Sequence, residues 1–200
     1  MKPCWVVVKR LLDIAFSLLG IVFLAPLLAL VAILVRLDSP GPALYRDERM
    51  GRHGKPFTMY KFRSMHIDSP VRRNPDGSTY VAQNDPRVTR VGRVLRRGFD
   101  ELPQLFNVFR GDMSLVGPRP DPPEALPHYR EADKKRLLVR PGLTGLAQVS
   151  GRTDIPWRER LLYDLEYVER TSPWLDAKIA VYTVVELIPP LRQRRLKRIK

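Results

Sequence analysis

A long apolar run dominates the first part of the chain. Residues 14–35 include no charged side chain, and basic residues stand on both sides of them. As a continuous helix, at about 1.5 Å per residue, the run would just cross a bilayer. Pro26 lies near its middle, where a proline removes a backbone hydrogen bond and clashes with the preceding turn. The pattern therefore predicts a membrane helix over residues 1–38 that is broken, by a kink or a full reversal, at Ala25–Pro26.

The basic residues around this run bear on its membrane topology. They are Lys2, Lys9 and Arg10 before it and Arg36, Arg46, Arg49, Arg52 and Lys55 after it. Because Lys and Arg mark the cytoplasmic ends of membrane helices, a straight span would leave one basic flank outside. A re-entrant helix that returns to the cytoplasmic face keeps both flanks and both termini inside. We favour it over a Pro-kinked span, which is the alternative.

Beyond residue 38 the pattern changes to short alternating segments and amphipathic stretches. Residues 43–46 and 57–63 are typical of strands and would form a β-hairpin around Gly51 and Gly54. Residues 66–86 are polar, with several turn signals, which predicts a loop. Residues 87–97, about 153–171 and 174–188 have helical spacing of apolar positions.

The arginine-rich helix expected over residues 87–97 suits the surface of an anionic membrane, or equally a core-packed helix with a solvated charged face. The resulting fold class is α+β, in a monotopic membrane protein. It has a re-entrant N-terminal helix (1–38), a cytoplasmic domain (39–190) with interfacial amphipathic helices and a short β-hairpin, and a basic tail (191–200).

Composition narrows the partners of the protein. The chain has 200 residues, enough for one domain with a real core, and a formal net charge of +14. Such a charge indicates a polyanionic partner, which could be nucleic acid, anionic lipid or a phosphorylated substrate. The single cysteine, Cys4, excludes an intrachain disulfide framework. The three histidines lack metal-ligand spacing, so neither a zinc site nor a Ser-His-Asp triad is indicated.

Asp100 and Glu101 are the first candidates for chemistry. We expect Asp100 to be the N-cap of a helix whose first turn contains Glu101 and Pro103. Both acids would then meet the positive end of that helix, which favours ionised carboxylate and also attracts phosphate. An isolated Asp-Glu pair at this place is more often only a capping device.

Arg119 is the second candidate, because it lies between Pro118 and Pro120. The two rings restrict the backbone around it, so that its guanidinium could bind a phosphate through two parallel hydrogen bonds. A lone Pro-Arg-Pro is usually a surface turn, so the rest of the chain must decide.

Five longer motifs extend these candidates. In order they are RLDSPGP (36–42), YKFRSM (60–65), DELPQL (100–105), GDMSLVGPRP (111–120) and RPGLTGLAQVSGR (140–152). Together they resemble the bacterial sugar transferases, the monotopic phosphoglycosyl transferases, over essentially the whole chain. Several long motifs in the same order are far more specific than one short pattern.

The resemblance implies a reaction. A sugar 1-phosphate would pass from a UDP-sugar to polyprenyl (undecaprenyl) phosphate, releasing UMP and starting lipid-linked glycan assembly at the cytoplasmic face of a bacterial inner membrane. It implies that Asp100 is the nucleophile and forms a covalent phosphosugar, and that Glu101 handles metal or protons. Mg²⁺ on the diphosphate would neutralise charge that repels the attacking carboxylate.

The resemblance also implies roles for a wider set of residues. Substrate or phosphate contacts fall to Arg119, Arg96, Lys61, Pro118, Pro120, Gln148 and Arg152, and metal contacts to Asp100, Glu101 and, more weakly, Asp176. The connection before the acids is one residue shorter than in the family, which leaves Arg97 as the alternative to Arg96. An anionic phospholipid membrane is an expected partner, nucleic acid is not, and a homodimer stays open.

Two rival interpretations fit parts of the sequence. A membrane-tethered nucleic-acid-binding protein would explain the charge and the basic tail, and a structural protein of the membrane interface would explain the apolar run and the amphipathic helices. Neither explains an acid pair together with Arg119, and no recognisable nucleic-acid motif is present.

Overall fold

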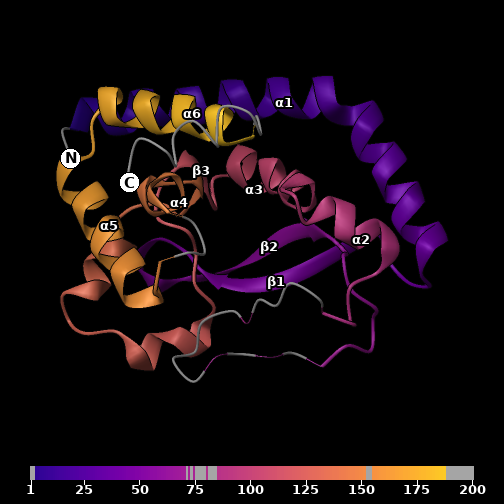
Figure 1. The fold of residues 1–200 in the computed structure, drawn as a ribbon. Helices are drawn as coiled ribbons and strands as arrows, with labels where there is room; N and C mark the ends of the chain where they lie inside the picture. The colour runs from indigo at the N-terminus through magenta and orange to yellow at the C-terminus, as the bar shows by residue number, and fades with distance from the viewer. Residues whose placement is uncertain are drawn as a thin grey trace.

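The computed structural model describes residues 3–70, 72, 74, 80, 85–151 and 155–187. It is a mixed α+β fold with one long N-terminal helix and two small sheets (Figure 1). The helices are α1 (Pro3–Asp38), α2 (Arg90–Leu95), α3 (Gln104–Arg110), α4 (Leu146–Ser150), α5 (Trp157–Arg170) and α6 (Pro173–Leu187). The strands are β1 (Leu44–Met50), β2 (Pro56–Phe62), β3 (Ser114–Val116) and β4 (Gly142–Thr144). Short 3-10 helices are η1 (Arg52–Gly54), η2 (Phe99–Glu101), η3 (Pro123–His128) and η4 (Asp133–Leu138).

Helix α1 bends but does not reverse. It is one continuous helix that contains Pro26, and Figure 1 shows it crossing the top of the molecule before it turns downward. The backbone therefore neither reverses nor leaves the helix at Ala25–Pro26, and the re-entrant membrane topology of this bent helix stays a prediction. The kink is the alternative that agrees with the fold, because an interior proline removes one hydrogen bond without ending the helix.

Most of the surface of α1 is apolar and exposed. The helix is long and apolar enough to cross a membrane, and only 11% of its most apolar window is buried, so it is not the core helix of a globular domain. Its inner face is different, because Asp13 and Ser17 are buried there. Asp13 Oδ1 accepts hydrogen bonds from the Ser114 hydroxyl at 3.1 Å and the Leu115 amide at 2.9 Å, which ties α1 to β3.

Both ends of α1 are held by the rest of the fold. Near its start, Arg10 donates from Nη1 to the Val108 carbonyl and from Nη2 to the Phe109 carbonyl, each at 2.7 Å. At its end, the Val91 amide donates to Asp38 Oδ2 at 2.8 Å, and Arg63 donates to the carbonyl of Ser39, the next residue after the helix. The two ends of the membrane helix therefore contact the same folded unit.

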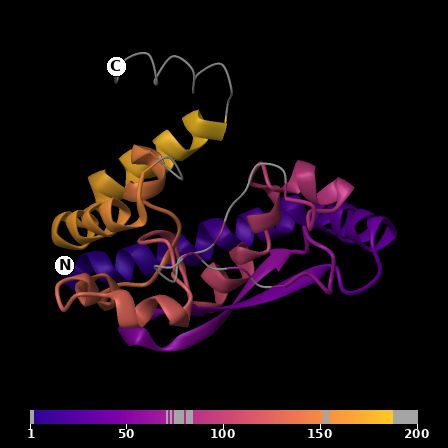
Figure 2. The ribbon, with the colours of Figure 1, turned by 60° about the horizontal axis from the view of Figure 1, so that its bottom comes forward.

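The expected β-hairpin is present. Strands β1 and β2 pair antiparallel from Leu44 opposite Phe62 to Met50 opposite Pro56, so β1 extends four residues beyond the predicted end at Arg46. Helix α3 lies between α1 and this hairpin, as Figures 1 and 2 both show. Asn107 fastens it there, because its side-chain amide donates to the Thr58 carbonyl and accepts from the Tyr60 amide, as a neighbouring strand would.

The second half of the chain agrees with the predicted helices and adds one unexpected sheet. Helices α5 and α6 lie close to the expected ranges, although residues 152–154 and the tail 191–200 fall outside the described residues. Helix α2 is shorter than the predicted 87–97, and part of the expected loop over 66–86 is likewise not described. Strands β3 and β4 form a parallel pair that the sequence did not predict, because three-residue strands are too short to show a periodicity.

Asn107 offers a test of this arrangement. We expect Asn107→Ala to lower the free energy of unfolding by about 1–3 kcal/mol, because two backbone groups of β2 would lose their partners. Arg110→Ala, at an exposed position of the same helix, should change it by less than about 0.5 kcal/mol. Urea unfolding in detergent micelles measures both values. Equal losses in the two variants would show that Asn107 does not hold α3 on the hairpin.

Candidate active site

The two acids lie in a tight turn between α2 and α3. Asp100 and Glu101 belong to the 3-10 helix η2, which Gly98 precedes with a φ of +122°. The residue that caps α3 is Pro103, so the expectation that Asp100 is the N-cap of this helix is wrong. The physical reason is Gly98, since its left-handed backbone lets the chain reverse and form a separate turn before α3 begins.

Glu101 forms an ion pair with Arg119. Arg119 Nη1 donates to Glu101 Oε2 at 3.1 Å, and Nη2 donates to Oε1, so that the guanidinium binds both carboxylate oxygens. Burial alone would raise the pKa of Glu101, but the charge and hydrogen bonds of Arg119, with further help from Lys61, lower it from 4.5 to about 2. Glu101 is therefore ionised at neutral pH and occupied by the arginine.

Asp100 behaves differently from its neighbour. Burial and the negative charge of Glu101 raise the pKa of Asp100 from 3.8 to about 6, although Lys61 and Arg119 act in the opposite direction. We expected a helix end to favour its ionisation, and this expectation is wrong because desolvation and like-charge repulsion are stronger here. The turn thus contains two different carboxylates. Glu101 is bound by Arg119, whereas Asp100 is more basic and forms no ion pair in the described part of the chain.

The backbone around Arg119 is fixed by contacts as well as by prolines. Pro118 and Pro120 are both buried, and Arg119 is partly exposed between them. Four consecutive carbonyls accept hydrogen bonds: that of Pro118 from the Gly142 amide (2.8 Å), that of Arg119 from Arg136 Nη2 (2.5 Å), that of Pro120 from Arg49 Nη1 (3.3 Å) and that of Asp121 from the Met50 amide (3.0 Å). We call residues 118–121 the arginine segment.

Lys61 on β2 is also part of the site. Its charge acts on both Asp100 and Glu101, and its own Nζ lies 3.4 Å from Asp47 Oδ2. Burial, together with the positive charges of Arg49 and Arg119, lowers the pKa of Lys61. The structure therefore brings together four of the expected residues, namely Asp100, Glu101, Arg119 and Lys61.

Sequence reasoning missed Asp47 and Arg49 as part of this site. Both are buried charged residues at alternate positions of β1, and Arg49 donates to Asp47 Oδ2 as well as to the arginine segment. The alternation placed them on one face of a strand, but the sequence gives no indication of which face is buried.

Two other expected contacts lie in different surroundings, and a third is not described. Arg96 is an exposed residue that ends α2 and acts electrostatically on Asp85. Gln148 donates from Nε2 to the Leu143 carbonyl at 3.0 Å, while its Oε1 is buried without a hydrogen-bond partner in the described residues. Arg152 lies outside the described residues.

Asp176 is not near the acid pair in charge or contact. Its carboxylate accepts from Lys9 Nζ at 2.6 Å and from the Tyr167 hydroxyl at 2.7 Å, and the charges that act on it are Lys9 and Asp13. None of these residues is among the charges that act on Asp100. Asp176 thus links α6 to α1 in this structure, and its expected metal contact stays a prediction. Among the described residues no group of three acidic, histidine or cysteine side chains could hold a metal.

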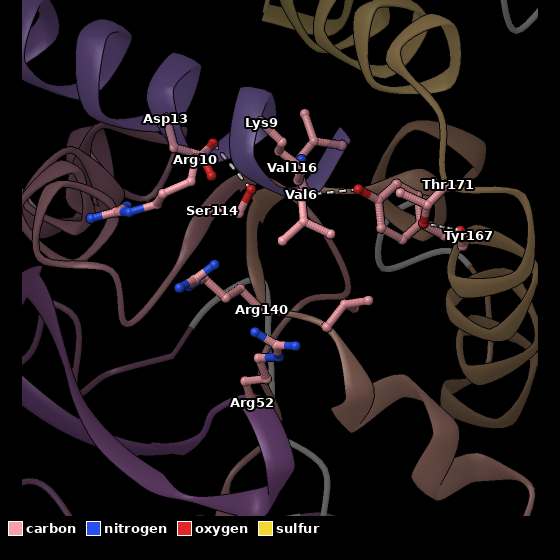
Figure 3. Close-up of a pocket in the computed structure, with 11 residues that line it drawn as sticks. Val6, Lys9, Arg10, Asp13, Arg52, Ser114, Val116, Arg140, Tyr167 and Thr171 are labelled. Atoms are coloured by element: carbon pink, nitrogen blue, oxygen red, sulfur yellow. Dashed lines mark hydrogen bonds between the residues drawn. The ribbon is translucent and has the colours of Figure 1, made fainter. Parts of the chain in front are cut away.

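One surface pocket lies away from the acid pair. It has a volume of about 20 Å³ and is shown in Figure 3, where Arg10, Arg52 and Arg140 line it from different segments beside the start of α1. The acid pair and Arg119 are not among its lining residues. Arg119 instead lines a second, smaller pocket together with Pro118 and Arg136.

The chain thus joins a long apolar helix to a domain in which an acid pair lies against an arginine that backbone contacts hold in place. The family model for bacterial sugar transferases matches residues 4–189 of the chain. The protein therefore belongs to the bacterial sugar transferase family, which confirms the resemblance seen in its motifs.

Several curated relatives are similar over most of this chain. An undecaprenyl-phosphate glucose phosphotransferase of Komagataeibacter xylinus is 45% identical over 88% of this chain and 35% of the relative. An undecaprenyl-phosphate galactose phosphotransferase of Salmonella typhimurium is 42% identical over 88% of this chain and 39% of the relative. A UDP-glucose:undecaprenyl-phosphate glucose-1-phosphate transferase of Caulobacter vibrioides is 44% identical over 90% of this chain and 69% of the relative. The chain thus spans little more than a third of the length of the first two.

We expect the two acids to affect stability in opposite directions. The raised pKa of Asp100 means that its ionisation costs stability: the cost is absent below 3.8 and complete above about 6. Asp100→Asn should therefore become more thermostable than the wild type as the pH rises from about 4 to about 7. The lowered pKa of Glu101 means that its ionised form stabilises the fold, fully above 4.5 and progressively less as the pH falls through about 2.

Glu101→Gln should accordingly be less stable than the wild type at neutral pH. Thermal melts of the three proteins across this pH range in one detergent measure the effect. A neutral-pH melt in which Asp100→Asn is no more stable than the wild type would contradict the raised pKa of Asp100.

Proposed function

We propose that the protein moves a sugar 1-phosphate from a UDP-sugar to polyprenyl (undecaprenyl) phosphate through a phosphosugar bound covalently to Asp100. The observation that carries the proposal is the difference between the two acids: Arg119 binds Glu101, and Asp100 forms no ion pair with any described residue. Three relatives with the names given above support the class of donor and acceptor. Neither rival interpretation of the sequence accounts for this arrangement.

The first step would be attack on the donor. An ionised Asp100 oxygen forms a bond to the β-phosphorus of the UDP-sugar, and the bond between this phosphorus and the bridging oxygen breaks. The electron pair leaves with that oxygen on UMP. A pKa of about 6 suits this role, because Asp100 is mostly ionised at neutral pH and more basic than an ordinary carboxylate.

The second step would return the enzyme to its starting state. A phosphate oxygen of polyprenyl phosphate attacks the same phosphorus, and the bond to Asp100 breaks with its electron pair on the carboxylate. The products are a polyprenyl diphosphosugar and free Asp100. Arg119 and Lys61 would bind the phosphate oxygens of donor and acceptor, on which negative charge is concentrated in both steps.

Mg²⁺ fits this site as an ion shared between the protein carboxylates and the substrate phosphates. It usually takes one or two carboxylates and completes its shell with waters and substrate phosphates, so a dedicated cage of acids is not needed. Asp100 and Glu101 would supply the protein oxygens, and the ion would neutralise part of the diphosphate charge. Asp100 attacks in the first step and is the leaving group in the second, while Arg119 and Lys61 orient the phosphate in both.

We also infer the membrane topology of α1. Its two ends are hydrogen-bonded to one folded unit, through Arg10 near the start and Asp38 at the end. A straight span would place these ends on opposite sides of the bilayer and would pull polar parts of the domain into hydrocarbon. A re-entrant α1, with both termini and the domain at the cytoplasmic face of the bacterial inner membrane, avoids this cost and keeps both basic flanks inside.

The covalent intermediate gives the most direct test of the reaction. Incubation with UDP-glucose or UDP-galactose and Mg²⁺, without lipid acceptor, should release at most one equivalent of UMP and leave a phosphosugar on Asp100. Mass spectrometry of the intact protein and of its peptides detects the adduct. Asp100→Ala should abolish both the adduct and the burst, while Glu101→Gln should slow them. An adduct on Glu101, or UMP release only when lipid acceptor is present, would refute the mechanism.

The topology has its own test in Cys4, the single cysteine of the chain. A membrane-impermeant thiol reagent should fail to label Cys4 in intact spheroplasts and should label it after the membrane is opened. Labelling in intact spheroplasts would replace the re-entrant helix with a kinked span. A variant with the cysteine moved to an exposed position of the domain provides the cytoplasmic reference.

A further inference from the structure

Arg136 is a buried charge that no expected role explains. It lies in η4 with 4% of its surface exposed. Its Nη1 donates to Asp121 Oδ2 at 2.7 Å, and its Nε and Nη2 donate to Asp164 Oδ2 at 3.0 and 2.6 Å. Two carboxylates therefore surround one guanidinium, in a place far too buried for solvent to screen them.

Its two carboxylates are themselves held in place. Asp121 Oδ2 also accepts from the Tyr129 hydroxyl at 2.8 Å and from Trp157 Nε1 at 3.1 Å. The rings of Tyr129 and Trp157 pack 5.9 Å apart. Asp164 comes from α5. The direction of the Arg136 guanidinium is thus set by groups from three segments, and the side chain has little freedom to move.

Stability alone is a weak reason to keep such a cluster. Buried ion pairs gain little over apolar residues of similar volume, since the cost of removing charge from water offsets the attraction. What an apolar group could not do is donate a hydrogen bond. Arg136 Nη2 donates at 2.5 Å to the carbonyl of Arg119, the residue at the centre of the arginine segment.

We infer that Arg136 is a positioning residue that fixes the backbone of Arg119 and thereby holds its guanidinium on Glu101, beside Asp100, where the phosphate of the donor would bind. The inference rests on the proposed function, because it assumes that Arg119 binds that phosphate. Arg49 assists from the other side through its bond to the Pro120 carbonyl, and its own charge is balanced by Asp47. Misplacing a charged group by about 1 Å can cost a reaction on the order of a hundred-fold in rate.

The substitution Arg136→Lys separates the effect of the charge at this position from the effect of its hydrogen-bond geometry. An ammonium keeps the positive charge between Asp121 and Asp164, but it lacks the planar fork that serves both acids and the Arg119 carbonyl at once. Arg87→Lys is the matched control. Arg87 forms a comparable buried pair with Asp85, with side chains 10% and 3% exposed, and has no bond to the arginine segment.

The experiment measures the UMP burst from UDP-sugar and Mg²⁺ without acceptor. Its amplitude counts correctly folded sites, and its rate constant reports the chemistry at each of them. Arg136→Lys should lower the rate constant about ten-fold or more, as an orientation loss of this kind predicts, with its amplitude near that of the wild type. Arg87→Lys should keep the wild-type rate constant. A lower amplitude with an unchanged rate constant would make Arg136 merely structural.

A double-mutant cycle shows whether Arg136 acts through Arg119. If it does, Arg136→Lys should have little further effect on the rate constant in an Arg119→Lys background. Equal fold-losses in the two backgrounds would overturn the inference. If Arg136→Lys does not fold, Tyr129→Phe replaces it in the same cycle, since it removes one hydroxyl from the cluster and should lower the rate constant less, again only when Arg119 is present.

The outcome is distinguishable from a failure of the proposed function. A wild-type protein that releases no UMP from any UDP-sugar would refute the function itself. A wild-type burst together with an Arg136→Lys variant that matches Arg87→Lys in both amplitude and rate constant would refute only the positioning role.

Discussion

The hydrogen bonds on the arginine segment are the constraint on which the site depends. Carbonyls 118 to 121 are each bound by a donor from elsewhere, namely Gly142 of β4, Arg136 of η4, and Arg49 and Met50 of β1. Because these donors come from three distant parts of the chain, Arg119 is placed only when the whole domain has folded. Arg119 then holds Glu101 ionised, and burial together with the charge on Glu101 raises the pKa of Asp100. The two adjacent acids therefore have different pKa values.

Three buried arginines of this domain have the same structural role. Arg49, Arg63 and Arg136 are each at most 5% exposed, and each donates to backbone carbonyls of another segment. Arg63 joins the hairpin to the end of α1, whereas Arg10 joins the start of α1 to the end of α3. Guanidinium groups suit this task because they donate in several fixed directions at once. The membrane helix and the reactive turn are consequently parts of one hydrogen-bonded framework.

The sequence predicted what local patterns determine. The apolar helix, the hairpin and helices α5 and α6 follow from periodicity, and the choice of Asp100, Glu101 and Arg119, which the structure brings together, follows from motifs. It did not predict features that depend on distant contacts: Arg136 becomes important only because η4 packs beside the arginine segment, and Asp176 pairs with Lys9 across the whole chain. The capping role expected of Asp100 failed for a local reason, since one glycine at position 98 redirects the backbone into a separate turn. The folded structure determines which charges lie close together, and hence the pKa values, so a sequence motif alone does not predict them.

The central claim is that the two adjacent acids have different pKa values, because Arg119 pairs with Glu101 and not with Asp100, and carbon-13 NMR of labelled carboxyl groups measures this directly. Spectra of Asp100→Asn and Glu101→Gln assign the two signals in a titration of the detergent-solubilised protein. The account predicts that Asp100 titrates near pH 6 and that Glu101 stays ionised to about pH 2. Two signals that titrate together at about pH 4, near the values of free side chains, would contradict it.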